Sequence, residues 1–240
     1  MNRYEMAMPP LLMNNTVATS LPVITWLGRQ NYEESLRLQR RLHRQRAAGR
    51  ITDQLLLLEH EPVYTLGRHA DPANLLPDRP GDVPVVQTDR GGDVTYHGPG
   101  QLTGYPIMRL ADYQLGVRRY VTLLEEALME LVATYGLTAR RRDGLPGVWL
   151  DDRKVASIGI RLSRGITCHG FALNIAVPPR YLDGMIPCGE PRIRMGNLND
   201  FLVKPTTPAA CAGRITPVFH RLLGSLAAPP LSSTRFAHVG

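Results

Sequence analysis

The feature that most limits the fold is a change in the spacing of apolar residues at Gly136. Before it, apolar residues recur every three or four positions: Val117, Tyr120, Val121, Leu124, Leu128, Leu131, Val132 and Tyr135. This spacing predicts an amphipathic helix that Gly136 ends. After it, residues 137–175 form short alternating runs, which predict strands separated by turns at Asp151-Asp152 and at residues 163–165. Several strands therefore follow one helix directly, without regular βαβ alternation.

The remaining segments also mix helices with strands. Short apolar runs bounded by turn residues predict strands at residues 23–27, 55–59, 63–66, 85–88 and 101–109. Residues 32–47 have helical spacing and end before Gly49, and residues 208–226 are helical in pattern. Pro217 lies inside the latter segment and predicts a break in it. The fold class that we expect is α+β, with helices packed on a mixed β-sheet, rather than a doubly wound parallel sheet.

The length of the chain fits one large domain or two small ones, and its hydropathy is typical of a globular protein in water. The chain has 240 residues, of which 43% are hydrophobic and 20% charged, as in ordinary globular proteins. No segment approaches the roughly 18 to 20 consecutive apolar residues of a membrane span. The N-terminus lacks the pattern of an export signal. We expect a flexible tail over residues 1–22, a single domain over residues 23–227, a C-terminal tail over residues 228–240, and a cytoplasmic protein without membrane association.

The formal net charge is +7, and arginines are clustered. Six of them lie between positions 37 and 50, and Arg140, Arg141 and Arg142 are consecutive. Such clusters are either solvated surfaces or docking sites for an acidic partner. No nucleic-acid recognition motif is present, so nucleic acid is not the expected partner.

The three cysteines differ in their surroundings. An odd, widely spaced set is not a disulfide framework. Cys168 and Cys211 lie in strand-like and alanine-rich runs, whereas Cys188 stands between Pro187 and Gly189, where a turn would expose it. Cys188 is therefore the best candidate for a reactive thiol. The spacing of cysteines and histidines matches no zinc pattern, and we expect no metal site.

Residues 90–101, RGGDVTYHGPGQ, contain four glycines and a proline. Glycines let the backbone approach a ligand closely. The segment has neither the phosphate-loop pattern nor the dinucleotide pattern. Taken alone, it predicts a ligand-binding loop without identifying the ligand.

Five ordered blocks give this loop a context. They are RGGDVTYHGPGQL at 90–102, GVW at 147–149, RKVASIGIR at 153–161, HGFALN at 169–174 and IPCG at 186–189. Together they closely resemble the signature of the lipoyl(octanoyl) transferase family, over about residues 23–225. The resemblance implies a fold similar to the catalytic domain of biotin and lipoate protein ligases.

The resemblance also implies a reaction and partners. The reaction is transfer of an octanoyl group from octanoyl-acyl carrier protein to a lysine, the first step of protein lipoylation. The implied acceptors are the lipoyl domains of 2-oxo acid dehydrogenases and the glycine cleavage H protein. No cofactor is implied, and we expect a monomer.

By position, the resemblance makes Cys188 the carrier of the acyl group as a thioester and Lys154 its partner. A cysteine thiolate splits the transfer into two easier steps, and a nearby ammonium favours the thiolate form. The other expected site residues form the acyl pocket. They are Arg90, Gly91, Gly92, Asp93, Val94, Thr95, Tyr96, His97, Ser157, Ile158, Gly159, Gly170, Phe171 and Ala172.

Two alternatives remain open. An ATP-dependent lipoate–protein ligase could share the fold, although that chemistry needs no cysteine nucleophile. A non-catalytic module that binds acidic carrier proteins would also fit the charge.

Overall fold

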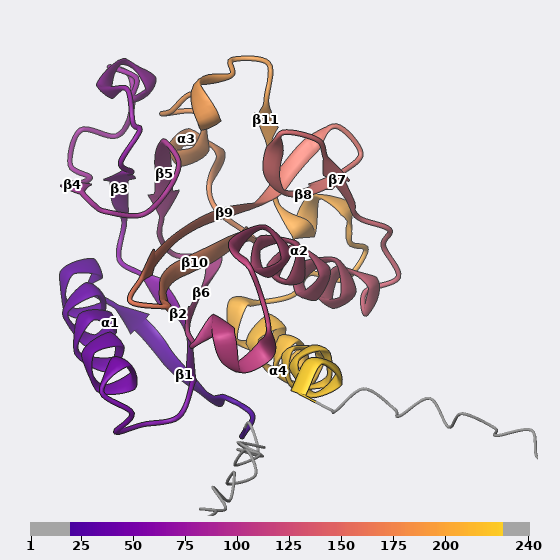
Figure 1. Ribbon diagram of the computed structural model, residues 1–240. Helices are drawn as coiled ribbons and strands as arrows, with labels where there is room; N and C mark the ends of the chain where they lie inside the picture. The colour runs from indigo at the N-terminus through magenta and orange to yellow at the C-terminus, as the bar shows by residue number, and fades with distance from the viewer. Residues whose placement is uncertain (1–19, 228–240) are drawn as a thin grey trace, which may run out of the picture.

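The computed structural model describes residues 20–227 and is built around a large mixed sheet (Figure 1). Its strand order is β1 (Val23–Gln30), β2 (Gln54–His60), β6 (Gln101–Ile107), β10 (Ile166–Asn174), β9 (Arg153–Ser163), β8 (Leu145–Leu150) and β7 (Arg140–Arg142). A short strand, β11 (Arg194–Met195), also pairs with β9. β1 runs parallel to β2 and β11 parallel to β9, whereas the other neighbours are antiparallel. The predicted α+β class with a mixed sheet is confirmed.

A second, three-stranded sheet has the order β4 (Val85–Gln87), β3 (Val63–Leu66) and β5 (Val94–His97). β5 lies inside the glycine-rich segment that the sequence predicted as a loop, and three of its four residues are buried. The glycines flank this strand instead of replacing it. The small sheet therefore carries the glycine-rich segment over one face of the large one.

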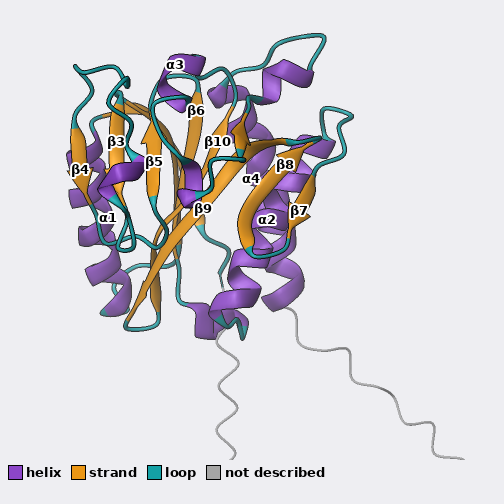
Figure 2. Ribbon diagram, turned by 90° about the horizontal axis from the view of Figure 1, so that it is seen from above, coloured by secondary structure: helices purple, strands orange, loops and turns teal. Residues whose placement is uncertain are grey.

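The helices cover both faces of the large sheet (Figures 1 and 2). α2 (Val117–Ala133) and α4 (Pro208–Ala227) pack together on one face, and α1 (Tyr32–Ala47) packs on β6 and β10 from the other. A one-turn helix, α3 (Pro179–Leu182), follows β10. α1 has the bounds that the sequence predicted, and α2 ends two residues before the predicted end. Both hairpin turns of the β8–β9–β10 segment are also confirmed.

Alternation along β2 explains how one strand serves two cores. Leu55 and Leu57 belong to the core beneath α2 and α4, while Leu56 and Leu58 belong to the core beneath α1. Successive side chains of a strand point to opposite faces, so an uninterrupted leucine run suits a strand with both faces covered.

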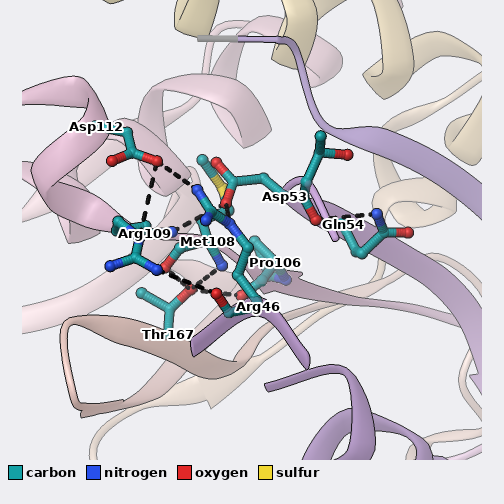
Figure 3. Close-up of polar contacts among 9 residues, drawn as sticks. Arg46, Asp53, Gln54, Pro106, Met108, Arg109, Asp112 and Thr167 are labelled. Atoms are coloured by element: carbon teal, nitrogen blue, oxygen red, sulfur yellow. Dashed lines mark hydrogen bonds and ion pairs between the residues drawn. The ribbon is translucent and has the colours of Figure 1, made fainter. Parts of the chain in front are cut away.

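The C-terminal end of α1 is held by ion pairs to the residue before β2 and to the segment after β6 (Figure 3). Arg46 Nε donates to Asp53 Oδ1 at 2.5 Å, and Arg46 also pairs with Asp112. Asp53 accepts a second hydrogen bond from the backbone N–H of Arg109, at 3.0 Å. This cluster joins the end of α1, the start of β2 and the segment after β6.

The expected break at Pro217 is wrong, because α4 continues through it from Pro208 to Ala227. Ile215, Val218 and Phe219 on either side of the proline are buried against the core beneath α2. Packing of this apolar face holds the helix together despite the hydrogen bond that a proline cannot donate.

The predicted tails lie almost entirely outside the described residues, since the structure describes neither 1–19 nor 228–240. Within residues 20–227, no helix is both long and apolar enough to cross a membrane.

Candidate active site

The structure brings Lys154 and Cys188 together from positions 34 residues apart. Lys154 Nζ donates to Cys188 Sγ at 3.4 Å. The lysine, on β9, is only 1% exposed, whereas Cys188 is exposed. A buried amino group thus supports a thiol that a partner protein can reach.

The pairing of β11 with β9 explains why Lys154 and Cys188 are in contact. The chain that follows Cys188 returns to β9, where Met195 is in register with Lys154. The backbone N–H of Gly196 donates to the Lys154 carbonyl at 3.0 Å. The segment that carries the thiol is therefore attached to the lysine's own strand.

Cys188 has a left-handed backbone, with φ of 59°, which is uncommon for residues other than glycine. The turn that contains it is held from both sides. Ile186 N–H donates to the Asn74 carbonyl at 2.8 Å, and the Asn74 side chain donates to Asp93 Oδ2 at 2.6 Å. Both side chains lie where they would meet a β-carbon on Gly189. Asp93, an expected pocket residue, thus supports the cysteine turn.

Lys154 has an unusual electrostatic environment. Its Nζ lies 5.1 Å from the centroid of the Trp149 ring, a cation–π distance. Among the described residues it forms no ion pair with a carboxylate, and Cys188 Sγ is its hydrogen-bond partner. A buried cation is unstable without a counter-charge. The group placed to offer a counter-charge, among the described residues, is Cys188, whose Sγ lies 3.4 Å from the amino group.

A buried carboxylate, that of Glu125, holds the backbone segment that packs against Lys154. Glu125, on α2 and 7% exposed, accepts the Gly147 N–H at 3.0 Å and the Arg141 Nε–H at 2.8 Å. A β-carbon on Gly147 would lie 2.7 Å from Lys154 Cε. Glu125 therefore fixes the backbone against which the lysine side chain packs.

The other two cysteines are unsuited to nucleophilic chemistry. Burial raises the pKa of Cys168 to about 11 and also raises the pKa of Cys211. Both thiols are therefore held protonated at neutral pH, and among the described cysteines Cys188 alone is exposed.

A pocket runs along β9 close to this pair and encloses about 370 Å³, part of it open to solvent. Ser157 lies three residues after Lys154 on β9, so the pocket begins roughly 10 Å from the lysine along the strand. Arg90, in its wall, is close enough to Cys188 to interact with it electrostatically. Such a position suits a chain attached to Cys188.

The pocket brings together most of the predicted binding residues and leaves some outside. Nine of them line it: Arg90, Thr95, His97, Ser157, Ile158, Gly159, Gly170, Phe171 and Ala172. Five others do not: Gly91, Gly92, Asp93, Val94 and Tyr96. Tyr96 is wholly buried between the rings of Tyr64 and Tyr181.

The glycines of this segment approach protein rather than an open site. Gly91 N–H donates to the Ile160 carbonyl on β9 at 2.9 Å. A β-carbon on Gly159 would lie 2.8 Å from the Gly91 carbonyl oxygen. The glycine-rich segment therefore lies directly on β9, and this contact closes the pocket wall.

The polar lining of the pocket is mostly neutral. Burial lowers the pKa of His97 well below its usual value, and it raises the pKa of Tyr32 to about 12. The Arg90 guanidinium is 6% exposed and donates to the Thr65 side chain and backbone. His97 is held by Gln101 at 2.8 Å. The pocket thus places an apolar patch of Ile158, Phe171 and Ala172 beside polar groups that are hydrogen-bonded to residues outside the lining.

Three lining residues were not among the predicted ones: Tyr32, Tyr105 and His169. Tyr32 begins α1 and Tyr105 lies on β6, and no local pattern marks either as a pocket residue. His169 had a signal, because it opens the HGFALN block. Its φ of 57° is another left-handed exception, and its Nε2 lies 2.7 Å from Asp89 Oδ1.

Comparisons with known proteins identify the family of this chain. Residues 31–220 match the model of the lipoyl protein ligase A/B catalytic domain. The chain belongs to this family. It is 45% identical over 194 residues to an octanoyltransferase from Methylococcus capsulatus, covering 80% of this chain and 92% of that one. It is 41% identical over 214 residues to an octanoyltransferase from Leifsonia xyli, covering 86% and 93%.

Solved structures extend the comparison at the level of fold. A putative lipoate protein ligase from T. acidophilum superposes with a TM-score of 0.63 at 14% identity, covering 87% of this chain and 92% of that one. A biotin protein ligase from Aquifex aeolicus gives 0.53 at 12% identity, covering 85% and 72%. The predicted family and fold are therefore confirmed.

Within the part of the chain that the structure describes, no group of histidine, cysteine and acidic side chains could hold a metal ion.

Proposed function

We propose that this protein moves an octanoyl group from octanoyl-acyl carrier protein to a lysine of lipoyl domains, through a thioester on Cys188. The observation that carries the proposal is the pair formed by a buried lysine and an exposed cysteine at 3.4 Å. Octanoyl transfer itself has the support of octanoyltransferases that are 45% and 41% identical to this chain over the aligned residues.

In the first step, Lys154 holds the proton of the Cys188 thiol, which leaves an ammonium–thiolate pair. The thiolate attacks the carbonyl carbon of the donor thioester, and the bond from that carbon to the carrier sulfur breaks. The departing carrier thiolate takes the proton from Lys154. The products are free carrier thiol, octanoyl-Cys188 and a neutral Lys154.

In the second step, the acceptor lysine attacks the octanoyl-Cys188 carbonyl as a neutral amine. Lys154, neutral at this stage, accepts the proton that the amine loses as the amide forms. The bond from carbon to Cys188 sulfur breaks, and the thiolate returns to its place beside the new Lys154 ammonium. One thioester is thus exchanged for one amide, and no cofactor is needed.

The acceptors that we propose are the lipoyl domains of 2-oxo acid dehydrogenases and the glycine cleavage H protein, in the cytoplasm, with the enzyme acting as a monomer. One structural neighbour was solved as a bipartite lipoate protein ligase studied with its E2 lipoyl domain. Its likeness in fold supports an acceptor of this class.

The test is the intact mass of the protein after mixing with octanoyl-acyl carrier protein. We expect one added octanoyl group in the wild type and in Cys168→Ser, and none in Cys188→Ser. An adduct that persists in Cys188→Ser would show that another residue is the nucleophile. Product formed from octanoate, ATP and a lipoyl domain without carrier protein would identify a ligase instead.

The role of Lys154 has its own test. Replacement by Ala, or by Met to keep the volume, should slow formation of the adduct at neutral pH. The loss should shrink at high pH, because the thiol then ionises without help. A loss that stays constant with pH would point to damaged structure rather than to missing proton transfer.

A further inference from the structure

The structure divides the clustered arginines into those that already interact with other groups of the protein and those that do not. Arg46 is held by Asp53 and Asp112, and Arg37 lies beside Glu33 and Glu34.

The consecutive arginines at 140–142 are engaged as well. Arg140 donates to the Asp151 carbonyl, Arg141 pairs with Glu125, and Arg142 lies over the Trp149 ring. The expectation that this run is available to dock a partner is therefore weakened, because its guanidinium groups already have structural roles.

A different set of basic side chains forms a groove between α1 and the β9–β10 hairpin. It is lined by Arg40, His43, Arg44, Arg161, Ser163, Arg164 and Cys168. His43 Nε2 lies 3.0 Å from the Ser163 carbonyl oxygen, which joins the helix to the hairpin. The arginines come from two segments that are more than a hundred residues apart in the chain, so no sequence cluster contains all of them.

The charge of this groove is largely uncompensated. Arg40, Arg44 and Arg164 are exposed, and among the described residues they form no ion pair with a carboxylate. Asp89 is the acidic group beside the groove. It is shared by Arg161 and His169 and also interacts electrostatically with Arg40, and the hydrogen bond with His169 lowers its pKa to about 2. Asp89 therefore stays ionised but engaged, and the groove attracts further negative charge.

The groove adjoins the pocket but lies far from the nucleophile. Cys168 lines the groove, and the next residue, His169, lines the pocket. Arg161 lies seven residues after Lys154 on β9, which corresponds to roughly 23 Å along the strand. The pocket-lining residues Ser157, Ile158 and Gly159 lie between these two positions on β9.

This separation distinguishes the two proteins that the reaction requires. An acceptor presents a lysine side chain, whose short reach obliges its domain to dock beside Cys188. A carrier presents its thioester at the end of a long flexible arm, so its body can dock at a distance while the arm reaches back to Cys188. An acidic carrier surface also complements the arginines.

We propose that the groove lined by Arg40, Arg44, Arg161 and Arg164 is the docking site for an acidic surface of the acyl-carrying donor protein. The inference rests on the proposed function, because it assigns a place to the donor of that reaction. Arg41 is an exposed arginine on the same helix that does not line the groove, and it provides a matched control.

The test compares Arg40→Glu/Arg164→Glu with Arg41→Glu/Arg118→Glu, which changes the charge equally away from the groove. Initial rates are measured with octanoyl-acyl carrier protein and with octanoyl-pantetheine, which has the arm but no protein. We expect the groove variant to lose roughly tenfold or more in kcat/KM for the protein donor. Its rate with octanoyl-pantetheine should equal that of the control, and salt should inhibit it less than the wild type.

Each other result has a distinct meaning. If both double variants respond alike to the protein donor, the groove is not the docking site. If the KM for the lipoyl domain rises instead, the groove binds the acceptor and the assignment to the donor is wrong. If the wild type forms no Cys188 adduct with either donor, it is the proposed function that fails.

Discussion

At the residue scale, the position of the Lys154 side chain depends on Gly147, which has no side chain. Gly147 has a φ of 141°, and a β-carbon there would lie 2.3 Å from the Ala156 carbonyl oxygen as well as close to Lys154 Cε. The Lys154 side chain occupies the space that a side chain at position 147 would fill. The GVW block is therefore part of the lysine's setting, although it contains no reactive group.

Gly147→Ala is expected to slow acylation of Cys188 by at least tenfold, because the new methyl group displaces Lys154 from the thiol. Gly144→Ala is the matched control, since Gly144 also has a positive φ but open space around it. Both variants should lose about 1 to 3 kcal/mol of stability from backbone strain, and Gly147→Ala should lose more because its β-carbon also clashes with the Ala156 carbonyl oxygen. Equal acylation rates with octanoyl-pantetheine would mean that the lysine's position does not matter.

At the element scale, α1 serves both the pocket and the groove, and its attachment decides whether either keeps its shape. Tyr32 at its first turn lines the pocket, and Arg40 and Arg44 line the groove. The ion pairs of Arg46 with Asp53 and Asp112 hold its last turn against β2 (Figure 3).

Arg46→Ala should lower the free energy of unfolding by about 2 to 3 kcal/mol, because it leaves the buried Asp53 carboxylate without its cation. Arg50→Ala removes an exposed arginine just after the same helix and should change stability by less than about 0.5 kcal/mol. Urea unfolding measures both. Similar losses in the two variants would show that the Arg46 pairs contribute nothing beyond general charge.

The elements also show what the sequence could predict. Helical spacing was sufficient for α1 and α2, and turn residues were sufficient for the hairpins around β9, because these signals act over neighbouring positions. Pro217 misled the prediction for α4, since the packing that overrides it comes from distant side chains. β5 was missed because its flanking glycines concealed a buried four-residue strand.

For the candidate site too, local sequence signals could be predicted and contacts between distant segments could not. The resemblance identified Cys188 and Lys154, but their contact depends on β11, a two-residue strand with no pattern of its own. Tyr32, Tyr105 and the basic groove could not be predicted from the sequence for the same reason. Each is assembled from segments whose proximity exists only in the folded chain.

At the scale of the whole molecule, buried histidines tie stability to pH. Burial lowers the pKa of His60 to about 4 and lowers that of His97 well below its usual value. Between about pH 6.5 and pH 4 the unfolded chain binds protons at these positions and the folded chain does not. The contribution of these two histidines to stability is therefore present above about pH 6.5 and is lost as the pH falls towards 4.

His60→Gln should make this dependence shallower. The difference in unfolding free energy between wild type and variant should shrink by about 2 kcal/mol from pH 7.5 to pH 5, since one proton-binding site is removed from the unfolded chain. His69→Gln, which removes an exposed histidine, is the control. Urea titrations at the two pH values give the answer, and a constant difference would mean that His60 protonates equally in both states.

The bond from the Gly196 N–H to the Lys154 carbonyl has a consequence for how the enzyme can be observed. This amide closes the loop that carries Cys188, so the proton exchanges with deuterium when the loop lifts from β9. Its exchange rate reports how often the lysine and the cysteine separate, without any substrate present. A single backbone proton, eight positions beyond Cys188, thus reports the opening of the segment that carries the proposed nucleophile.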